Sequence, residues 1–205
     1  MTRFILASAS PRRRDLLRQL GLDFEVWPSQ LEESNFSELS PAMRVEALAL
    51  AKAKAVAAVV SQEVLVIGAD TIVVYQGEVL GKPASATEAE AMLALLSGKT
   101  HTVYTGVALV RAPGGEGKST HASTEVTFRH LSPQVISSYV ATREPMDKAG
   151  GYGIQGRGAL LVAGIKGDYS NVVGLPLVKL AELMEQFGVN IWGEVGCDAK
   201  TGLHN

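Results

Sequence analysis

The sequence predicts an α/β fold in which a mixed sheet is flanked by helices and carries one long β-hairpin. Three observations support this prediction. Strand-like and helical segments alternate through most of the chain, two long β-type segments are joined by a glycine-rich turn, and no repeat or low-complexity linker interrupts the order. A chain of 205 residues is expected to form one domain, or two closely joined lobes, with a core of ordinary size.

The first half of the chain begins with a strand, a turn and a helix. Residues 4–7 form a short apolar run, and Ser10 with Pro11 supplies the cap and first turn of a helix that continues to Leu20. The segments that follow are predicted as a strand at 22–27, a polar loop at 29–40, an alanine-rich helix at 41–61, strands at 64–67 and 71–74, and a further strand at 78–80 after a Gln76-Gly77 turn.

The second half contains the predicted hairpin. Its two strands, 101–110 and 120–131, are separated by the turn residues 113–117. The other predicted segments are helices at 87–96, 133–142 and 176–187, a glycine-rich turn at 150–158 and a strand at 159–165. Residues 193–205 have the pattern of a flexible tail, so the predicted domain is 1–192.

Composition excludes several functional classes. The 19 Lys+Arg and 21 Asp+Glu leave a formal charge of −2, which gives no general attraction to nucleic acid or an anionic membrane. The single cysteine, Cys197, excludes an internal disulfide and a cysteine-rich zinc site. The apolar run at the amino terminus precedes the arginines, the reverse of a secretory signal, and every apolar stretch is far shorter than the roughly 20 residues that span a bilayer. We expect a cytoplasmic protein without nucleic-acid or membrane partners.

Two nucleotide-binding patterns occur in the wrong context. Residues 112–119 resemble a phosphate-binding loop, but the following segment alternates as a strand, whereas the motif needs a helix. Residues 151–156 spell a dinucleotide fingerprint, yet no βαβ unit surrounds them. Their glycines would still allow the backbone to approach a ligand closely, so this turn is predicted as a possible wall of a binding site.

Three consecutive arginines are the first candidate for anion binding. Arg12, Arg13 and Arg14 lie in the first turns of a predicted helix, where the helix dipole disfavours cations. A phosphate chain would compensate these charges. The alternative is a charge run screened by water and salt.

Lys52 is the second candidate because it lies on the apolar side of its helix. At about 100° per residue, Val45, Leu48, Val56 and Val59 fall within about 40° of it, whereas Lys54 is about 200° away and is predicted to be solvated. Lys52 is therefore expected to enter a site from the core side. The alternative is a buried stem whose amine reaches water.

Asp70 is the third candidate because it follows a buried strand that ends in small residues. A carboxylate there needs a cation or hydrogen bonds, and Mg²⁺ held by Asp70 with Glu33 or Glu32 and by phosphate oxygens would supply one. Asp70 as a turn cap is the alternative. Lys82, in a tight turn after the strand at 78–80, is either a further site cation or a surface lysine.

Five ordered motifs resemble those of the Maf family of nucleoside triphosphate pyrophosphatases, whose fold is related to that of the inosine triphosphatases. They are LASASPRR at 6–13, GADT at 68–71, GKP at 81–83, GKTH at 98–101 and DKAGGYGIQG at 147–156, and the likeness extends from about Phe4 to Phe187. The resemblance implies two lobes around a cleft, a divalent cation such as Mg²⁺ or Mn²⁺, hydrolysis of a nucleoside triphosphate to the monophosphate and pyrophosphate, and usually a homodimer.

The resemblance also implies residue roles. Asp70 corresponds to the family's proton acceptor and Glu33 to a metal-site carboxylate; Ser8, Arg13, Lys52 and Lys82 correspond to its phosphate site; and Arg12, Thr71 and Gln155 correspond to the specificity set of the branch that prefers dTTP and UTP.

Hydrolysis of a phosphoanhydride depends chiefly on positioning and charge stabilisation. We therefore predict that Asp70, Lys52 and Lys82 are catalytic. Asp70 would orient or deprotonate the attacking water, and Lys52 and Lys82, with Arg13, would neutralise the pyrophosphate. The predicted role is house-cleaning of the nucleotide pool, with modified pyrimidine nucleotides as further substrates. The alternative is a regulatory protein that binds a nucleotide without turnover and is linked to septum formation.

Overall fold

The computed structural model describes residues 2–31, 36 and 38–194, and its centre is a mixed β-sheet. Seven strands in this described part are ordered β2-β1-β3-β5-β6-β7, with β4 also paired to β3. They are β1 (Phe4–Leu6), β2 (Phe24–Val26), β3 (Val64–Tyr75), β4 (Glu78–Leu80), β5 (Thr100–Ala112), β6 (Gly117–Phe128) and β7 (Val162–Lys166). Strand β1 pairs in parallel with β2 and β3, and the other pairs are antiparallel. The α/β class with flanking helices is thus confirmed.

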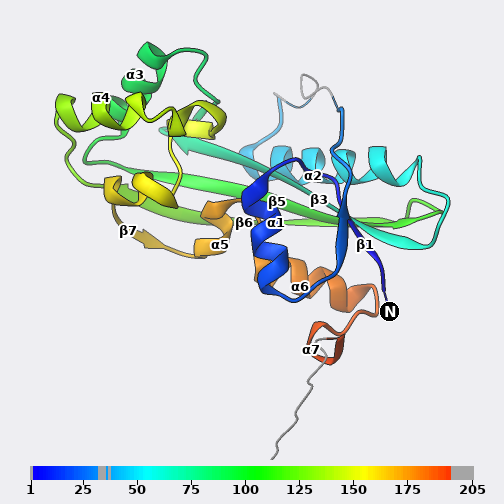
Figure 1. The fold of residues 1–205 in the computed structure, drawn as a ribbon. Coiled ribbons are helices and arrows are strands. Elements are labelled where there is room, and N and C mark those ends of the chain that lie inside the picture. Colours follow the sequence, from blue (N-terminus) through cyan, green and yellow to red (C-terminus); the bar gives the residue numbers. More distant parts are fainter. Residues whose placement is uncertain (1, 32–35, 37, 195–205) are drawn as a thin grey trace, which may run out of the picture.

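Helices cover both faces of the sheet and one end of it (Figure 1). Helix α2 lies on one face, α1, α5 and α6 lie on the other, and α3 and α4 lie at the end. Their bounds are α1 (Pro11–Gln19), α2 (Pro41–Ala57), α3 (Ala86–Leu96), α4 (Pro133–Ala141), α5 (Tyr169–Val173), α6 (Leu177–Gln186) and α7 (Ile191–Glu194). Among the residues with described structure, no helix is long and apolar enough to span a membrane.

Two glycines allow α2 to approach the sheet closely. A Cβ atom at Gly68 of β3 would overlap the Ala49 carbonyl oxygen of α2, and one at Gly106 of β5 would overlap that of Val45. Helix α2 therefore rests directly on the backbone of the two central strands.

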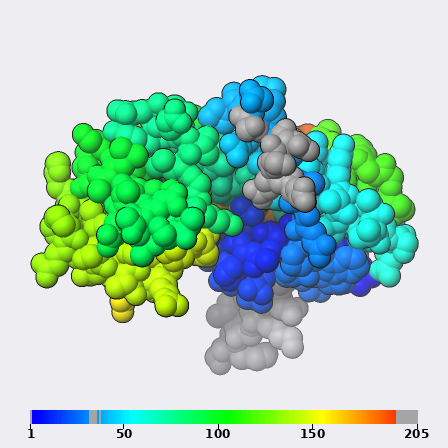
Figure 2. All heavy atoms as spheres, turned by 90° about the horizontal axis from the view of Figure 1, so that it is seen from above, coloured from blue at the N-terminus to red at the C-terminus, as the bar shows by residue number. Residues whose placement is uncertain are grey.

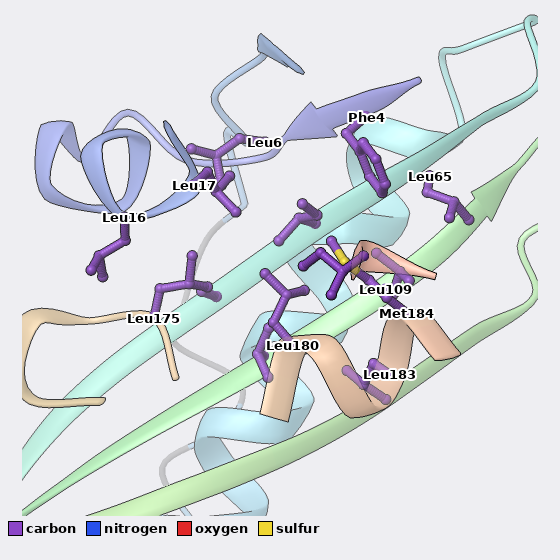
Figure 3. Close-up of a cluster of buried hydrophobic side chains, with 14 of the residues drawn as sticks. Phe4, Leu6, Leu16, Leu17, Leu65, Leu109, Leu175, Leu180, Leu183 and Met184 are labelled. Atoms are coloured by element: carbon purple, nitrogen blue, oxygen red, sulfur yellow. The ribbon is translucent and has the colours of Figure 1, made fainter. Parts of the chain in front are cut away.

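The hydrophobic core consists of three clusters. One lies between the sheet and helices α1 and α6 and includes Phe4, Leu17, Leu109, Leu180 and Met184 (Figure 3). A smaller, alanine-rich cluster lies under α2, and a third joins the far ends of β3, β5 and β6 to α3 and α4.

In the space-filling view, the green surface of the α3–α4 region stands beside the blue amino-terminal surface (Figure 2).

The edge of β3 opposite β5 is only partly covered by other strands. Strand β1 pairs with Leu65 to Ile67 and β4 pairs with Val73 to Tyr75, so, within the described chain, the edge between these two segments has no strand partner. Asp70 and Thr71, which are consecutive residues of β3, fall within this gap. Backbone groups and side chains of alternating direction can therefore contribute to one site there.

Several predicted boundaries were wrong. Strand β3 is continuous through Asp70, so the turn-cap alternative is excluded. Helix α2 ends at Ala57 instead of Ser61, which leaves Val59 73% exposed, outside the apolar stripe assigned to it. The strand predicted at 159–165 begins later than expected, because residues 159–161 belong to a 3₁₀ segment, η4 (Gly156–Leu161), and β7 begins at Val162. The hairpin is confirmed, with β6 starting at Gly117.

Among the described residues, two short α-helices were not predicted. Helix α5 is only five residues long and lies between predicted elements. Helix α7 includes Gly193 and Glu194, which were assigned to the tail. The remaining tail residues, 195–205, lie outside the described part of the chain, so the predicted domain boundary stays a prediction.

Candidate active site

A cleft of about 610 Å³ lies along the open edge of β3. It is bounded by the segment after β1, the first turn of α1, helix α2, the turn after β4 and the glycine-rich segment before η4. Every predicted site residue within the described chain lines it: Ser8, Arg12, Arg13, Lys52, Asp70, Thr71, Lys82 and Gln155. Glu33, and its alternative Glu32, lie outside the described residues. The structure thus brings together residues that are as far as 147 positions apart in the sequence.

The cleft is strongly cationic although the chain is not. Its described charged side chains are the cations Arg12, Arg13, Arg44, Lys52, Lys82 and Lys148 and the carboxylates Asp70 and Asp147, a formal excess of four positive charges. The whole sequence has a formal charge of −2. Because a cleft with low-dielectric walls focuses the field of its charges, this arrangement favours a polyanionic ligand.

Lys52 and Asp70 form a shielded ion pair in the middle of the cleft wall. Lys52 Nζ donates to Asp70 Oδ1 at 2.6 Å, and the two side chains are only 14% and 10% exposed. The Lys52 amine therefore does not simply reach bulk water, and Lys54 is exposed as expected. The direction of Asp70 follows from its position in β3, because even-numbered residues near Gly68 face α2.

Arg13 crosses from α1 to the open edge of β3. Its guanidinium donates to Ser8 Oγ at 3.0 Å and to the Ala69 carbonyl oxygen at 2.8 Å. It also donates to Thr71 Oγ1 at 3.1 Å and to the Gly174 carbonyl oxygen at 2.8 Å. These contacts hold the end of β1, the middle of β3 and the segment after α5 together, so Arg13 shapes the cleft in addition to supplying charge.

Thr71 belongs to a chain of hydroxyl groups on the face opposite Asp70. Thr105 Oγ1 donates to the Asn171 carbonyl oxygen at 2.8 Å and lies 3.0 Å from Thr71 Oγ1. Because the Thr105 proton is used, Thr71 donates to Thr105 and accepts from Arg13. The hydroxyl proton of Thr71 is therefore committed within the protein.

Arg12 and Lys148 meet at an exposed carboxylate on the rim. Asp147 Oδ2 lies 3.3 Å from Arg12, and its Oδ1 accepts from Lys148 Nζ at 2.6 Å. Burial would raise the pKa of the Asp147 carboxyl, but the hydrogen bond and charge of Lys148, together with Arg12, lower it below its ordinary value. Asp147 stays ionised and links α1 to the opposite wall.

The turn that carries Gln155 is held in place by the carboxylate of Glu144. Glu144 accepts hydrogen bonds from the backbone N–H groups of Arg157 at 3.2 Å and Gly158 at 3.1 Å. It also accepts from Tyr139 Oη at 3.0 Å, while the N–H of Gly153 donates to the same tyrosine oxygen at 3.2 Å. Burial and the nearby Glu144 raise the pKa of Tyr139, so its hydroxyl remains a donor.

A buried aromatic group supports the same wall from behind. His101 Nε2 lies 2.6 Å from Tyr152 Oη, and the rings of both residues pack edge-on against Phe128. Burial lowers the pKa of His101 to about 4 and raises that of Tyr152, so both are neutral at pH 7. Tyr152 lines the cleft, as do Gly153 and Ile154, which confirms that the glycine-rich turn forms part of its wall.

Sequence reasoning missed two cations of this cleft. Lys148 lies within a quoted motif but was given no role, and Arg44 was not considered. A signal for Arg44 was present, because Arg44, Leu48 and Lys52 follow one another at four-residue spacing on α2. Arg14, by contrast, does not line the cleft with its two neighbours.

The described residues supply one carboxylate, Asp70, that is suited to a divalent cation and lies among the cations of the cleft. Mg²⁺ is commonly held by one or two carboxylates together with substrate phosphates and water, and Asp70 meets this requirement. No group of three or more His, Cys, Asp or Glu side chains that could form an all-protein metal site occurs among residues 2–31, 36 and 38–194. The donor set among the described residues therefore fits a cation whose remaining ligands come from a bound anion and water.

Known proteins of similar sequence were found, together with a solved structure of weaker likeness. The dTTP/UTP pyrophosphatase of Moorella thermoacetica is 65% identical over 195 residues, covering 95% of this chain and 100% of that protein. The dTTP/UTP pyrophosphatase of Pelotomaculum thermopropionicum is 51% identical over 191 residues, covering 93% and 100%. A solved nucleoside-triphosphatase / dITP/XTP pyrophosphatase from Mycobacterium abscessus covers 91% of this chain and 95% of its own at 16% identity, with a TM-score of 0.44.

The family comparison covers most of the chain. The model of the Maf-like proteins matches residues 3–187, a range that contains every predicted site residue. The chain belongs to the Maf family.

Proposed function

We propose that this protein hydrolyses dTTP and UTP to the nucleoside monophosphate and pyrophosphate. The observation that carries the proposal is the convergence of Asp70 and six cations in one cleft of about 610 Å³. The names of relatives that are 49–65% identical over most of the chain support the same activity. Removal of damaged or excess pyrimidine nucleotides is the proposed role, and modified pyrimidine triphosphates belong among the substrates to test.

The residues of this chain divide the work of the reaction. Asp70 orients and deprotonates the water that attacks the α-phosphorus, and Lys52 fixes the direction of its carboxylate through their 2.6 Å contact. Arg13, Lys52 and Lys82 stabilise the negative charge that accumulates on the departing pyrophosphate. Ser8 holds Arg13 and adds a hydroxyl group to the phosphate-binding end of the cleft.

A divalent cation, Mg²⁺ or Mn²⁺, is part of this proposal. Asp70 would hold it together with Glu33, and when bound it would neutralise phosphate charge and orient the phosphate oxygens. The oxygen ligands offered by carboxylates and phosphates suit both of these hard cations.

Base selection is assigned chiefly to Gln155, on the wall opposite Asp70. The Gln155 amide has a donor and an acceptor that match the edge of uracil or thymine, and Arg12 and Thr71 complete the proposed specificity set. Because the Thr71 proton is committed to Thr105, Thr71 contributes through its shape and the position of Arg13.

A substrate panel tests the proposal. Pyrophosphate and orthophosphate release are measured separately for dTTP, UTP, CTP, ATP, GTP and modified uridine triphosphates, with Mg²⁺, with Mn²⁺ and with EDTA. We expect pyrophosphate release, fastest with dTTP and UTP, and loss of turnover in EDTA. Orthophosphate as the product, or tight nucleotide binding without turnover, would contradict the proposal, and the second result would favour the regulatory alternative.

The assembly and location expected from the family complete the proposal. We propose a cytoplasmic homodimer. Light scattering coupled to size-exclusion chromatography, performed at several protein concentrations, tests the dimer, and a mass near 21.7 kDa throughout would contradict it. Fractionation of the cells that produce the protein tests its location.

A further inference from the structure

Arg44 is a cation of the cleft wall for which the described residues offer no side-chain partner. It lies in the first turns of α2, where it lines the cleft together with Leu48 and Lys52. Its Nε is buried and has no hydrogen-bond partner, and within the described chain Arg44 forms no ion pair. An unsatisfied buried donor is unfavourable, and so is a cation near the start of a helix.

The direction of α2 places Arg44 relative to the proposed chemistry. Ala49 lies over Gly68, and Val45 lies over Gly106, which pairs with Asp70. The helix therefore runs antiparallel to β3, and its first turns lie level with Asp70 or beyond, toward β4. Arg44 and Lys52 are separated by about 12 Å along the helix axis, so the two cations can contact different parts of one extended ligand.

We propose that Arg44 binds the phosphate chain of the substrate, as a cation additional to Arg13, Lys52 and Lys82. The proposal rests on the hydrolytic function proposed above and extends its binding site. A guanidinium suits this role because its planar array of N–H donors matches phosphate oxygens in two directions. The bound phosphate would supply an anion for Arg44 and an acceptor for its Nε, neither of which the described part of the chain provides.

Arg14 offers a matched control because the chain uses the same local arrangement twice. Ser10-Pro11 begins α1 and Ser40-Pro41 begins α2, and each arginine occupies the fourth helical position. The backbone N–H groups of Arg14 and Arg44 donate to the carbonyl oxygens of Ser10 and Ser40, respectively, and both Nε atoms are buried without a partner. Only Arg44 lines the cleft, so a difference between the two arginines reports on the ligand and not on the helix start.

The experiment compares Arg44→Gln, Arg44→Lys and Arg14→Gln with the unmodified protein. KM and kcat are measured with dTTP and UTP, and the affinity for inorganic pyrophosphate is measured by calorimetry. For Arg44→Gln we expect a KM raised about tenfold, a kcat changed less than threefold and a pyrophosphate affinity lowered about tenfold, as for the loss of one charge-assisted contact. The constants of Arg44→Lys should lie between those of Arg44→Gln and those of the unmodified protein. Every constant of Arg14→Gln should stay within twofold of its value in the unmodified protein.

Thermal unfolding separates binding from folding. Arg44→Gln and Arg14→Gln should have a Tm equal to or above that of the unmodified protein, because each removes a cation from a helix start. The proposal is overturned by unchanged KM and pyrophosphate affinity in Arg44→Gln, by equal losses in both Gln variants, or by losses that follow a lowered Tm. If the unmodified protein releases no pyrophosphate, the proposed function fails, and the calorimetric comparison still decides the role of Arg44. Absence of pyrophosphate binding by the unmodified protein would overturn the role assigned to Arg44 and would leave the hydrolytic function to the release assay.

Discussion

The two walls of the cleft are built differently. The wall that contains Lys52 and Asp70 consists of a central strand and a helix that rests directly on it, and its polar groups bind one another at 2.6–3.1 Å. The wall that contains Gln155 consists of 3₁₀ turns and glycine-rich backbone. Glu144, Tyr139 and the His101–Tyr152 pair hold that second wall in place.

This difference suggests a division between chemistry and recognition. Regular elements hold groups within narrow limits, which bond cleavage requires, whereas turns tolerate changes that alter substrate choice. We therefore expect changes in the first wall to reduce kcat for all substrates and changes in the second wall to alter KM and the order of substrates.

The largest expected effect is that of Asp70→Asn in the first wall. The amide keeps the shape of the carboxylate and can still accept from Lys52, but it is neither a base nor a charged ligand. We expect kcat with dTTP and UTP to fall at least about 1,000-fold while the far-ultraviolet circular dichroism and the Tm stay close to those of the unmodified protein.

Asp15→Asn is the control for this prediction because Asp15 is an exposed carboxylate of α1 that pairs only with Arg18 among the described residues. Its kcat should remain normal. Near-normal turnover by the Asp70 variant would contradict the role assigned to Asp70.

The second prediction concerns the support of the recognition wall at low pH. Burial lowers the pKa of His101 to about 4 in the folded state from 6.5 in the unfolded state. Between these values the unfolded chain binds a proton that the folded protein does not, so stability should fall as the pH decreases from about 6.5 to about 4. The two pKa values correspond to a loss of about 3 kcal/mol in the free energy of unfolding.

Urea denaturation at a series of pH values measures this loss. His101→Phe should remove most of the pH dependence in that range, at the expense of an unpaired Tyr152 hydroxyl. The exposed His130 is the control, and His130→Asn should retain the full dependence. An identical slope in all three proteins would show that His101 does not titrate as stated.

The third prediction concerns base recognition by Gln155 in the second wall. Gln155→Glu replaces an amide donor with a carboxylate, which should repel the carbonyl oxygens of uracil and thymine. We expect kcat/KM for dTTP and UTP to fall about tenfold relative to that for CTP or purine nucleotides, equivalent to about 1.4 kcal/mol. The same order of substrates before and after the change would remove Gln155 from base recognition.

The smallest expected effect is that of Glu144→Gln. The glutamine can still accept from some of the three donors that bind Glu144, but more weakly, so the turn that carries Gln155 should become less well defined. We expect KM to rise about threefold to fivefold with little change in kcat, consistent with a net loss of about 1 kcal/mol.

Glu90→Gln, an exposed site on α3, is the control for general effects of charge removal. A decrease in kcat of Glu144→Gln as large as the increase in its KM would indicate that the two walls are not independent.

Much of the first wall was predictable from local sequence patterns. The periodicity of α2 placed Lys52 on the core side, and the small residues before Asp70 indicated an unusual carboxylate. Their contact with each other was not predictable in this way, because it depends on the distance between α2 and the sheet. That distance is set by Gly68 and Gly106, which lie on different strands.

The second wall was less predictable because short turns leave weak patterns. The 3₁₀ segment η4 contains the apolar residues Ala159 to Leu161, which suggested a strand, and the left-handed Gly156 that starts it gave no indication of length. The contacts of Glu144 with Arg157 and Gly158 join backbone groups to a side chain 13 and 14 residues away, and sequence spacing carries no information about them.

Asp70 and Thr71 are neighbours in β3, so the site depends on which face of the sheet each of the two side chains points to. Consecutive residues of a strand face opposite sides, so the acid that meets Lys52 and the hydroxyl that meets Arg13 stay correctly assigned only while β3 keeps its offset against β5. Deleting one residue near Val64 would exchange the two sides, whereas deleting a pair would shift them along the strand without exchanging them. Relatives that differ in length before this strand are therefore expected to accommodate the difference in the loop after α2 and not within β3.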